Sequence, residues 1–253
     1  MMKYFGKTDI GAKRRNNQDS YAVISRGNFL CAIVCDGMGG AKGGNVASGL
    51  AVKTFASVIK KSAESGILDS MSKDEVKELL SGALRTANDE VYFKSISDED
   101  LDGMGTTLVA VLVCTAGCFA INVGDSRVYA DDGNEFRQVT KDHSFVQFLI
   151  DKGEITAEQA ALHPNKNIIL RAVGVNDSVE GDIFEINGCR RVLLCTDGLT
   201  NHVSESEIAD TIRGTPRGNG KMSSLKSRIQ LLIDRANANG GSDNITAVLL
   251  ENE

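Results

Sequence analysis

The apolar residues of this chain are concentrated in short, nearly continuous runs that occur in pairs. The first pair, SYAVIS at 20–25 and FLCAIVC at 29–35, is joined by the turn Arg26-Gly27-Asn28. Strand-like runs joined by a few polar residues that include glycine predict β-hairpins. The remaining runs lie at 107–114 and 118–123, at 127–130 and 135–139, and at 191–195 and 245–250.

Most of these runs lack the apolar–polar alternation of a sheet that is solvated on one face. Continuous apolar character therefore predicts sheets that are covered on both faces. Residues 73–94 carry apolar side chains at i, i+3, i+4 and i+7, and 45–61 and 222–238 have similar periodicity, which predicts amphipathic helices. Ser204 and Glu207 resemble a capping box and predict a shorter helix. The fold class expected is α+β, a layered sandwich of antiparallel sheet and helices.

The length of 253 residues permits one large domain or two small ones. Only two prolines occur, and no linker-like tract divides the chain, so we expect a single domain over 1–253. Hydrophobic residues make up 42% and charged residues 25%, which is typical of a soluble globular protein. A net charge of −6 argues against a general binder of nucleic acid or anionic membrane.

The sequence also indicates a compartment. No apolar stretch approaches the ~20 residues that a membrane span needs. Residues 1–19 lack the apolar core of a signal peptide. We therefore expect a cytoplasmic protein, and a monomer by default.

The six cysteines fall mostly in strand-like apolar runs. Two pairs share a C-x3-C spacing, but no CxxC knuckle or flanking histidine supports a zinc site. Buried, reduced thiols of a cytosolic protein are the favoured interpretation. The residues are Cys31, Cys35, Cys114, Cys118, Cys189 and Cys195.

Five aspartates stand at the ends of the predicted strands. In a hairpin, the start of the first strand and the end of the second lie at one edge, so Asp19 and Asp36 should be neighbours. Asp125 ends the second hairpin at the corresponding position. Asp197 follows one late run and Asp243 precedes the other, so the two meet if those strands pair antiparallel. All five are able to converge on a single rim.

A cluster of carboxylates is costly to remove from water unless a cation is bound. Ligands that are all oxygen favour Mg²⁺ or Mn²⁺. Several carboxylates can hold two such ions roughly 3.5–4 Å apart with a bridging water that becomes a nucleophile. The small neighbour Gly37 allows close backbone approach and makes its carbonyl a candidate metal ligand. Each aspartate alone is better explained as a turn or cap residue, so the inference rests on the five together.

Arg14 lies five residues before Asp19, where its guanidinium could grip a phosphate in a bidentate way. The alternative is a solvated basic patch at 13–15. The glycines of GMGGAKGG at 37–44 do not form a nucleotide loop. The dinucleotide pattern fails because its third glycine position is Lys42, and the Walker pattern fails because Gly43 follows that lysine.

These segments together resemble the metal-dependent protein phosphatases of the 2C type (the PPM family), in their compact bacterial form. The resemblance runs nearly end to end and in family order. The matching segments are GAKRRNNQD (11–19), VCDGMGG (34–40), MGTT (104–107), NVGDSRVY (122–129), KDHS (141–144), HPNKNIILRAVG (163–174), LLCTDGLT (193–200) and GGSDNITAVLL (240–250).

The resemblance implies a fold of two antiparallel sheets flanked by helices, an α-β-β-α sandwich. It also implies a two-metal site holding Mn²⁺ or Mg²⁺, with a third, weaker ion in bacterial members. A mobile flap beside the site corresponds to 144–174. The implied roles are metal bridging by Asp36, completion of the first metal site by Asp197 and Asp243, a carbonyl ligand from Gly37, ordering of metal-bound waters by Asp19, third-metal binding by Asp125, phosphate binding by Arg14 and support of Asp243 by Asn244.

The implied reaction is hydrolysis of phosphoserine or phosphothreonine in proteins, by direct attack of a metal-bridging hydroxide without a phosphoenzyme. Many eukaryotic relatives have a histidine, the proposed general acid, at the position of Met38, which cannot donate a proton. A metal-bound water is the simplest replacement, and His143 and His163 are the alternatives.

Two alternatives to this function stay open. A non-catalytic member of the fold is disfavoured because the acids of the metal site are all present. A substrate of the anti-sigma-factor-antagonist type would place the enzyme in another branch of the family. The expected partners are phosphorylated Ser/Thr proteins and a membrane-anchored Ser/Thr kinase that the phosphatase opposes.

Overall fold

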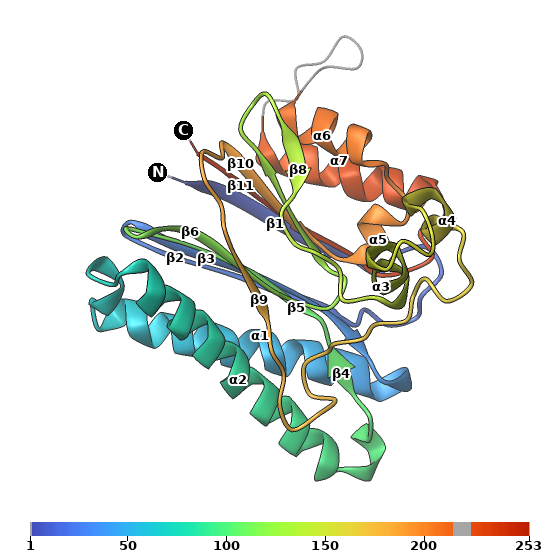
Figure 1. Cartoon of the computed structure of the whole chain (residues 1–253), viewed down its shortest axis with the longest axis horizontal. Helices are drawn as coiled ribbons and strands as arrows, with labels where there is room; N and C mark the ends of the chain where they lie inside the picture. The colour runs from blue at the N-terminus through green and yellow to red at the C-terminus, as the bar shows by residue number, and fades with distance from the viewer. Residues whose placement is uncertain (1, 215–223, 253) are drawn as a thin grey trace.

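The computed structural model describes residues 2–214 and 224–252, in which two antiparallel β-sheets pack face to face (Figure 1). In the first sheet the order is β1 (Lys3–Asp9), β11 (Ile245–Glu251), β10 (Arg191–Cys195), β7 (Arg127–Asp131) and β8 (Phe136–Gln138). In the second it is β2 (Asp19–Arg26), β3 (Phe29–Met38), β5 (Leu108–Cys114), β6 (Gly117–Val123) and β9 (Asp182–Glu185), and β4 (Gly105–Thr106) pairs with the end of β3.

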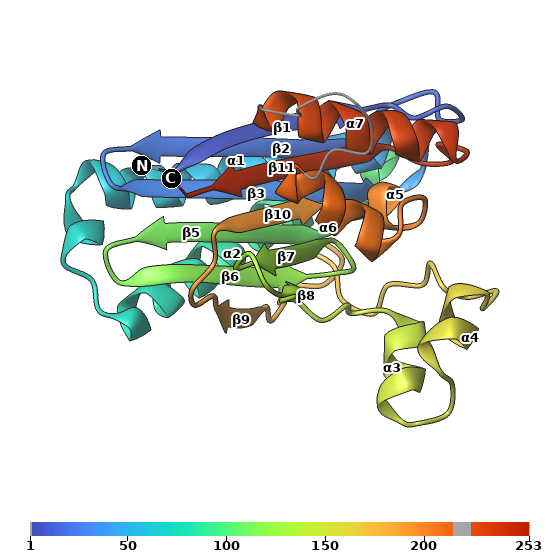
Figure 2. The same ribbon diagram turned by 90° about the horizontal axis from the view of Figure 1, so that it is seen from above.

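Helices cover the outer face of each sheet, which confirms the α-β-β-α layering (Figures 1 and 2). The second sheet is covered by α1 (Gly40–Glu64) and α2 (Lys73–Ile96), and the first by α5 (Asp197–Thr200), α6 (Glu205–Arg213) and α7 (Leu225–Ala238). Two short helices, α3 (Phe145–Asp151) and α4 (Ala157–Ala161), stand out from one end of the sandwich (Figure 2). Single 3-10 turns, Ile67–Asp69 and Glu99–Leu101, flank α2. Within the described residues, none of the helices combines the length and apolar character needed to cross a bilayer.

The continuous apolar runs are explained by three stacked apolar layers. Along β3, Cys31, Ile33 and Cys35 pack in the layer that includes the buried side chains of α1 and α2. The alternate residues Leu30, Ala32 and Val34 pack between the two sheets. A third layer lies between the first sheet and its helices. Both faces of the central strands are therefore buried, as the sequence predicts.

The three predicted hairpins are confirmed, and so is the antiparallel pairing of β10 with β11. Ser204 forms the predicted capping box at α6. The helix predicted at 45–61 begins earlier, at Gly40, because tertiary packing overrides the low helix propensity of its glycines. Of the helix predicted at 222–238, residues 222 and 223 lie outside the described residues. Strands β1, β4 and β9 escaped prediction because β4 is two residues long and the others contain charged residues.

The segment 144–174, called the flap segment, is closed on itself between residues 144 and 169. Ser144 and Ile169 form an antiparallel bridge. The Phe145 N–H donates to the Ile168 carbonyl at 2.8 Å, and the Leu170 N–H donates to the His143 carbonyl at 2.7 Å. Residues 144 and 169 are therefore joined with α3 and α4 between them, and residues 170–174 run on to the bridge between Thr106 and Val173.

Truncation on either face of β3 is expected to destabilise the protein. Ile33→Ala should lower the free energy of unfolding by about 2–5 kcal/mol, and Val34→Ala by somewhat less, because each leaves a cavity in a packed layer. Urea denaturation measures both, with the exposed Arg26→Ala as the control. A near-neutral result for either core variant would contradict burial on both faces.

Candidate active site

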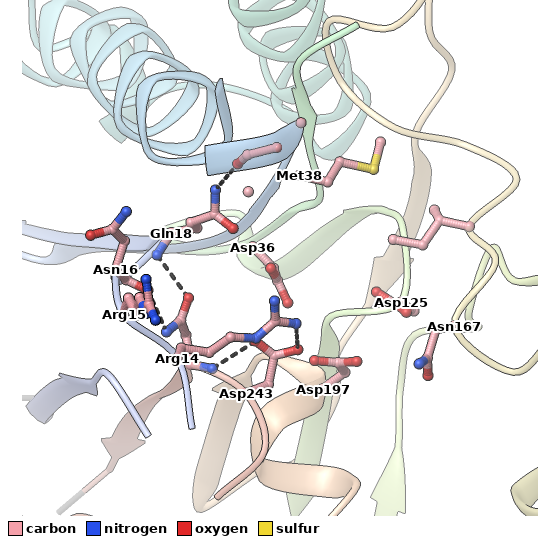
Figure 3. Close-up of a pocket in the computed structure, with 15 residues that line it drawn as sticks. Arg14, Arg15, Asn16, Gln18, Asp36, Met38, Asp125, Asn167, Asp197 and Asp243 are labelled. Atoms are coloured by element: carbon pink, nitrogen blue, oxygen red, sulfur yellow. Dashed lines mark hydrogen bonds and ion pairs between the residues drawn. The ribbon is translucent and has the colours of Figure 1, made fainter. Parts of the chain in front are cut away.

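A cleft of about 590 Å³ opens where strands of both sheets end (Figure 3). Asp36 and Asp125 reach it from the second sheet, and Asp197 and Asp243 from the first. Arg14 enters from the loop between β1 and β2. The predicted convergence of acids on one rim is therefore found. Asp19 does not line the cleft but is the register partner of Asp36 on the neighbouring strand, with only 7% of its surface exposed.

Hydroxyl groups hold Asp19 in place. Its Oδ2 accepts hydrogen bonds from Thr196 Oγ1 at 2.9 Å and from Thr246 Oγ1 at 2.6 Å. Thr246 lies in β11 and Thr196 directly follows β10, and both strands belong to the first sheet. These bonds therefore tie the two sheets together at the base of the cleft. The buried Oδ1 of Asp19 has no hydrogen-bond partner among the described residues.

The main chain of Asp36 is fixed by the segment MGTT. Its N–H donates to Thr107 Oγ1 at 2.9 Å, and its carbonyl accepts from the Thr107 N–H and the Thr106 hydroxyl, each at 2.8 Å. The Thr107 hydroxyl also bonds Ser126 Oγ at 2.7 Å, which connects Asp36 with the loop of Asp125. Sequence reasoning missed these positioning residues, although MGTT carried the signal as a matching segment.

Burial and like charge raise the pKa of most of these carboxyl groups. Burial, followed by repulsion from Asp19, holds the pKa of Asp36 well above its ordinary value. The pKa of Asp19 rises to about 7, and that of Asp125 to about 8, mainly through burial. Burial and then Asp243 raise the pKa of Asp197. This cluster of carboxyl groups is therefore more stable when it binds protons or has another positive charge beside it.

The donor set fits a hard cation. Besides the orphaned oxygen of Asp19, the buried Oδ1 of Asp197 has no described partner other than a neighbouring carboxyl. Buried carboxylate oxygens without donors are suited to Mg²⁺ or Mn²⁺. In the described part of the chain, no three acidic, histidine or cysteine side chains are gathered tightly enough to hold an ion unaided. Coordination would therefore require the carboxylates to draw together, with water or main-chain oxygen completing the shell.

Arg14 is the cation that faces these acids. Its Nη2 donates to Asp243 Oδ2 at 2.7 Å, and this hydrogen bond raises the pKa of Arg14 (Figure 3). Arg15 also lines the cleft. The side chain of Asn244 supports the Arg14 loop rather than the Asp243 carboxylate, since it bonds the Gln18 N–H and the carbonyls of Ile10 and Asn16. Only its main-chain N–H reaches Asp243 Oδ1, at 2.8 Å.

Gly37 lines the cleft and packs tightly against α1. A Cβ at this position would collide with the main chain of Gly44 and Gln18. The packing of β3 against α1 therefore requires a glycine at this position. This requirement is separate from the close approach of the backbone to an ion that the sequence suggested. Met38, the next residue, contributes a thioether to the cleft wall and no proton donor.

Neither histidine proposed as an alternative acid lines this cleft. The buried ring of His143 accepts the Gly124 N–H at Nδ1, at 3.2 Å, and its Nε2 lies 3.2 Å from Asp182 Oδ2. Both ring nitrogens are thus engaged in holding the loop before Asp125. His163 accepts the Asn165 N–H at Nδ1, and its ring lies 5.9 Å from that of Phe145 in a tilted arrangement within the flap segment.

A second cavity of about 530 Å³ lies between the flap segment and the sandwich. It shares Asp125, Asp197 and Asn167 with the first cleft, so the two are continuous. Its wall includes Arg127, whose guanidinium forms a two-pronged pair with Asp142 at 2.7–3.0 Å. The positive charge of Arg127 partly offsets the raised pKa values of Asp125 and Asp197.

A β-sandwich with clustered carboxylates and an arginine at its open edge is the arrangement that the sequence predicts for a metal-dependent phosphatase. The family model described as "Protein phosphatase 2C" matches residues 9–249, and the chain belongs to this family.

Related proteins and solved structures agree with this family assignment. The serine/threonine phosphatase stp of Listeria welshimeri is 39% identical over 248 residues, which cover 97% of this chain and 94% of that protein. The crystal structure of the serine/threonine phosphatase Stp1 from Staphylococcus aureus matches with a TM-score of 0.88 and 31% identity, covering 100% and 96% of the two chains. The catalytic domain of the phosphatase PstP in complex with 2 manganese ions matches at 0.80 and 32% identity, covering 99% and 97%. These relatives support a metal-dependent protein phosphatase.

The raised pKa values give stability a defined pH dependence. The folded, metal-free protein binds protons at Asp19 and Asp125 up to about pH 7–8, whereas the unfolded chain releases them near a pKa of about 3.9. This stabilisation is complete below about pH 4, declines steadily as pH rises, and is gone above about pH 8. In a chelator, the melting temperature should therefore fall from pH 5 to about pH 8.

The shift in melting temperature that Mn²⁺ produces should instead grow with pH, because metal binding requires ionised carboxylates. Differential scanning fluorimetry measures both trends. Asp36→Asn should raise the melting temperature in chelator at pH 8 and abolish the Mn²⁺ shift. A Mn²⁺ shift that is independent of pH would contradict this electrostatic account.

Proposed function

We propose that the chain hydrolyses phosphoserine and phosphothreonine in proteins as an Mn²⁺- or Mg²⁺-dependent phosphoric monoester hydrolase, with water attacking phosphorus directly. The observation that carries the proposal is the cleft of four carboxylates facing Arg14 in a chain of the 2C family. The complete set of acids disfavours a non-catalytic binding module.

The residues proposed to hold two ions are Asp36 as the bridging ligand, Asp197 and Asp243 at the first site, and the Gly37 carbonyl at the second. Asp19 would order water behind Asp36, and Asp125 would hold a third ion. When bound, such ions lower the pKa of water, polarise phosphoryl oxygens and balance the charge of the cluster. The orphaned oxygens of Asp19 and Asp197 support this assignment.

The composition of the cleft supports water as both nucleophile and proton donor. None of the described residues that line it is a serine, threonine, cysteine, lysine or histidine. The side chains usually phosphorylated in covalent mechanisms are therefore absent from this lining, apart from the aspartates already assigned to metal binding. Met38 offers no proton, and the ring nitrogens of His143 are engaged elsewhere.

Arg14 is proposed to bind the phosphate of the substrate. Its guanidinium now neutralises Asp243, which is also a proposed ligand. A divalent cation at Asp243 would take over that neutralisation and leave the guanidinium free to pair with phosphoryl oxygens. Substrate binding would then depend on prior binding of metal.

We further infer a single catalytic domain over 1–253, with the flap segment bordering the substrate, because the flap segment forms a wall of the second cavity. A membrane-anchored Ser/Thr kinase is the proposed opposing enzyme, and a cytoplasmic monomer is the proposed form. An anti-sigma-factor antagonist is the alternative substrate class.

The function is tested with p-nitrophenyl phosphate and a phosphothreonine peptide. Activity should require added Mn²⁺ or Mg²⁺, and Asp36→Asn should lower kcat by about 10²–10³ or more, because it weakens the charge that holds the metal cluster. Circular dichroism controls for folding. A folded wild-type protein that stays inactive with either metal would overturn the proposal, as would full activity of the variant.

Arg14 and its neighbour provide a matched comparison. Arg14→Ala should lower kcat/KM by about 10–100-fold through loss of charge-assisted hydrogen bonds to phosphate. Its Mn²⁺ affinity, measured by calorimetry, should not fall, because the guanidinium competes with metal for Asp243. Arg15→Ala should remain within about threefold of the wild type, since rim charges contribute little. Equal losses in both variants would argue for a general basic patch.

A further inference from the structure

A cysteine of the second sheet lies near a cysteine in the loop that leads into the first sheet, at the end of the sandwich opposite the cleft. Cys118 lies at the start of β6, seven residues before Asp125, and Cys189 lies just before β10, eight residues before Asp197. Strands β6 and β10 belong to different sheets (Figure 1). Both side chains pack at the margin of the apolar layer between the sheets.

The two cysteines are brought together by main-chain hydrogen bonds on both sides. The Cys118 carbonyl accepts the Ile186 N–H at 2.8 Å, three residues before Cys189. The Arg190 N–H, directly after Cys189, donates to the Asp131 carbonyl at 2.8 Å. Both side chains pack at the same margin of the apolar layer, near enough that each thiol shifts the pKa of the other.

Cys189 has the properties of a reactive thiol. The hydrogen bond from Cys118, helped by the nearby charge of Arg137, lowers the pKa of Cys189 to about 7 despite partial burial, whereas the pKa of Cys118 is raised. Cys189 also lines a small surface cavity of about 30 Å³ with Arg137 and Glu135. Cys189 is therefore a partly buried thiol that borders a surface cavity and has a lowered pKa.

The other cysteines lack this combination of a lowered pKa and a place beside a surface cavity. Cys31, Cys35 and Cys195 are fully buried, and burial raises the pKa of each. Cys114 is only four residues from Cys118, but it packs in the helix-facing layer, on the opposite face of the same sheet. The pleat therefore keeps Cys114 away from the pair.

We propose that Cys118 and Cys189 form an oxidation site that a hydroperoxide converts to a disulfide joining the two sheets. The Cys189 thiolate attacks the peroxide O–O bond to give a sulfenic acid, and the released hydroxide takes up a proton to become water. The Cys118 sulfur then attacks the Cys189 sulfur and loses its proton, and the hydroxide that leaves takes up that proton to become the second water. In sum, two thiols and hydrogen peroxide give one disulfide and two waters, a two-electron oxidation.

The disulfide would close a loop over 118–189, which contains Asp125, β7, β8 and the flap segment. Closing a long loop restricts the unfolded ensemble and so favours the folded state. Because the pair lies at the far ends of strands from the cleft, the bond should raise thermal stability while leaving phosphatase turnover unchanged. Its consequence is resistance to unfolding under oxidising conditions.

The test uses the full chain, reduced and then treated with hydrogen peroxide. Intact mass should fall by about 2 Da, the mass of two hydrogens, and peptide mapping should join Cys118 to Cys189. The melting temperature should rise by several degrees, and dithiothreitol should reverse every change. Cys114→Ser should behave like the wild type, whereas Cys118→Ser should gain oxygen atoms at Cys189 without an intramolecular bond.

Wild-type peptide mapping decides the matter even if a variant fails to fold. Oxygen addition at Cys189 without a cross-link would overturn the proposal. So would a cross-link through Cys114, or a cross-linked protein that melts at the same or a lower temperature than the reduced one. None of these outcomes depends on phosphatase activity, so they remain distinct from a failure of the proposed function.

Discussion

Mutual repulsion among the carboxylates at the open end of the sandwich is the constraint that the rest of the structure has to satisfy. Four acids share one cleft and a fifth lies buried beside Asp36, and burial raises the cost of ionising most of them. The protein holds them with neutral hydroxyls and main-chain groups. Thr196 and Thr246 clamp one oxygen of Asp19, and Thr107 fixes the main chain of Asp36. Such a rigid frame keeps the acids in place whether protons, Arg14 or metal ions neutralise them.

The cleft also depends on how the two sheets pack. Asp36 and Asp125 come from one sheet, whereas Asp197 and Asp243 come from the other. Neither sheet alone carries all four acids of the cleft. The apolar layer between the sheets therefore determines the spacing of the charged groups at its edge. This dependence explains why the central strands are apolar on both faces: a solvated face would leave one half of the site without its counterpart.

Sequence reasoning succeeded where local rules fix geometry. The hairpin rule alone places Asp19 beside Asp36, and the register confirms it. The capping box at Ser204 is likewise a local signal. The hydroxyl clamps could not be predicted, because a threonine in a strand is explained by β-propensity until its distant partner is known. The early start of α1 was missed for a related reason, since the fit of Gly44 against Gly37 involves residues on separate elements. The roles of the cleft residues come from family resemblance and remain proposals.

The bridge between residues 144 and 169 gives this part of the flap segment the character of an exchangeable unit. Because Ser144 and Ile169 are bridged, the chain between them starts and finishes at one point on the sandwich. Its interior can change in length or sequence without altering the distance that the core must span, and loop length adds little entropic cost. Divergence could therefore proceed quickly in this segment while the acids beneath it stay fixed. For protein engineering, the bridge marks natural splice points at which a flap from another phosphatase could be grafted.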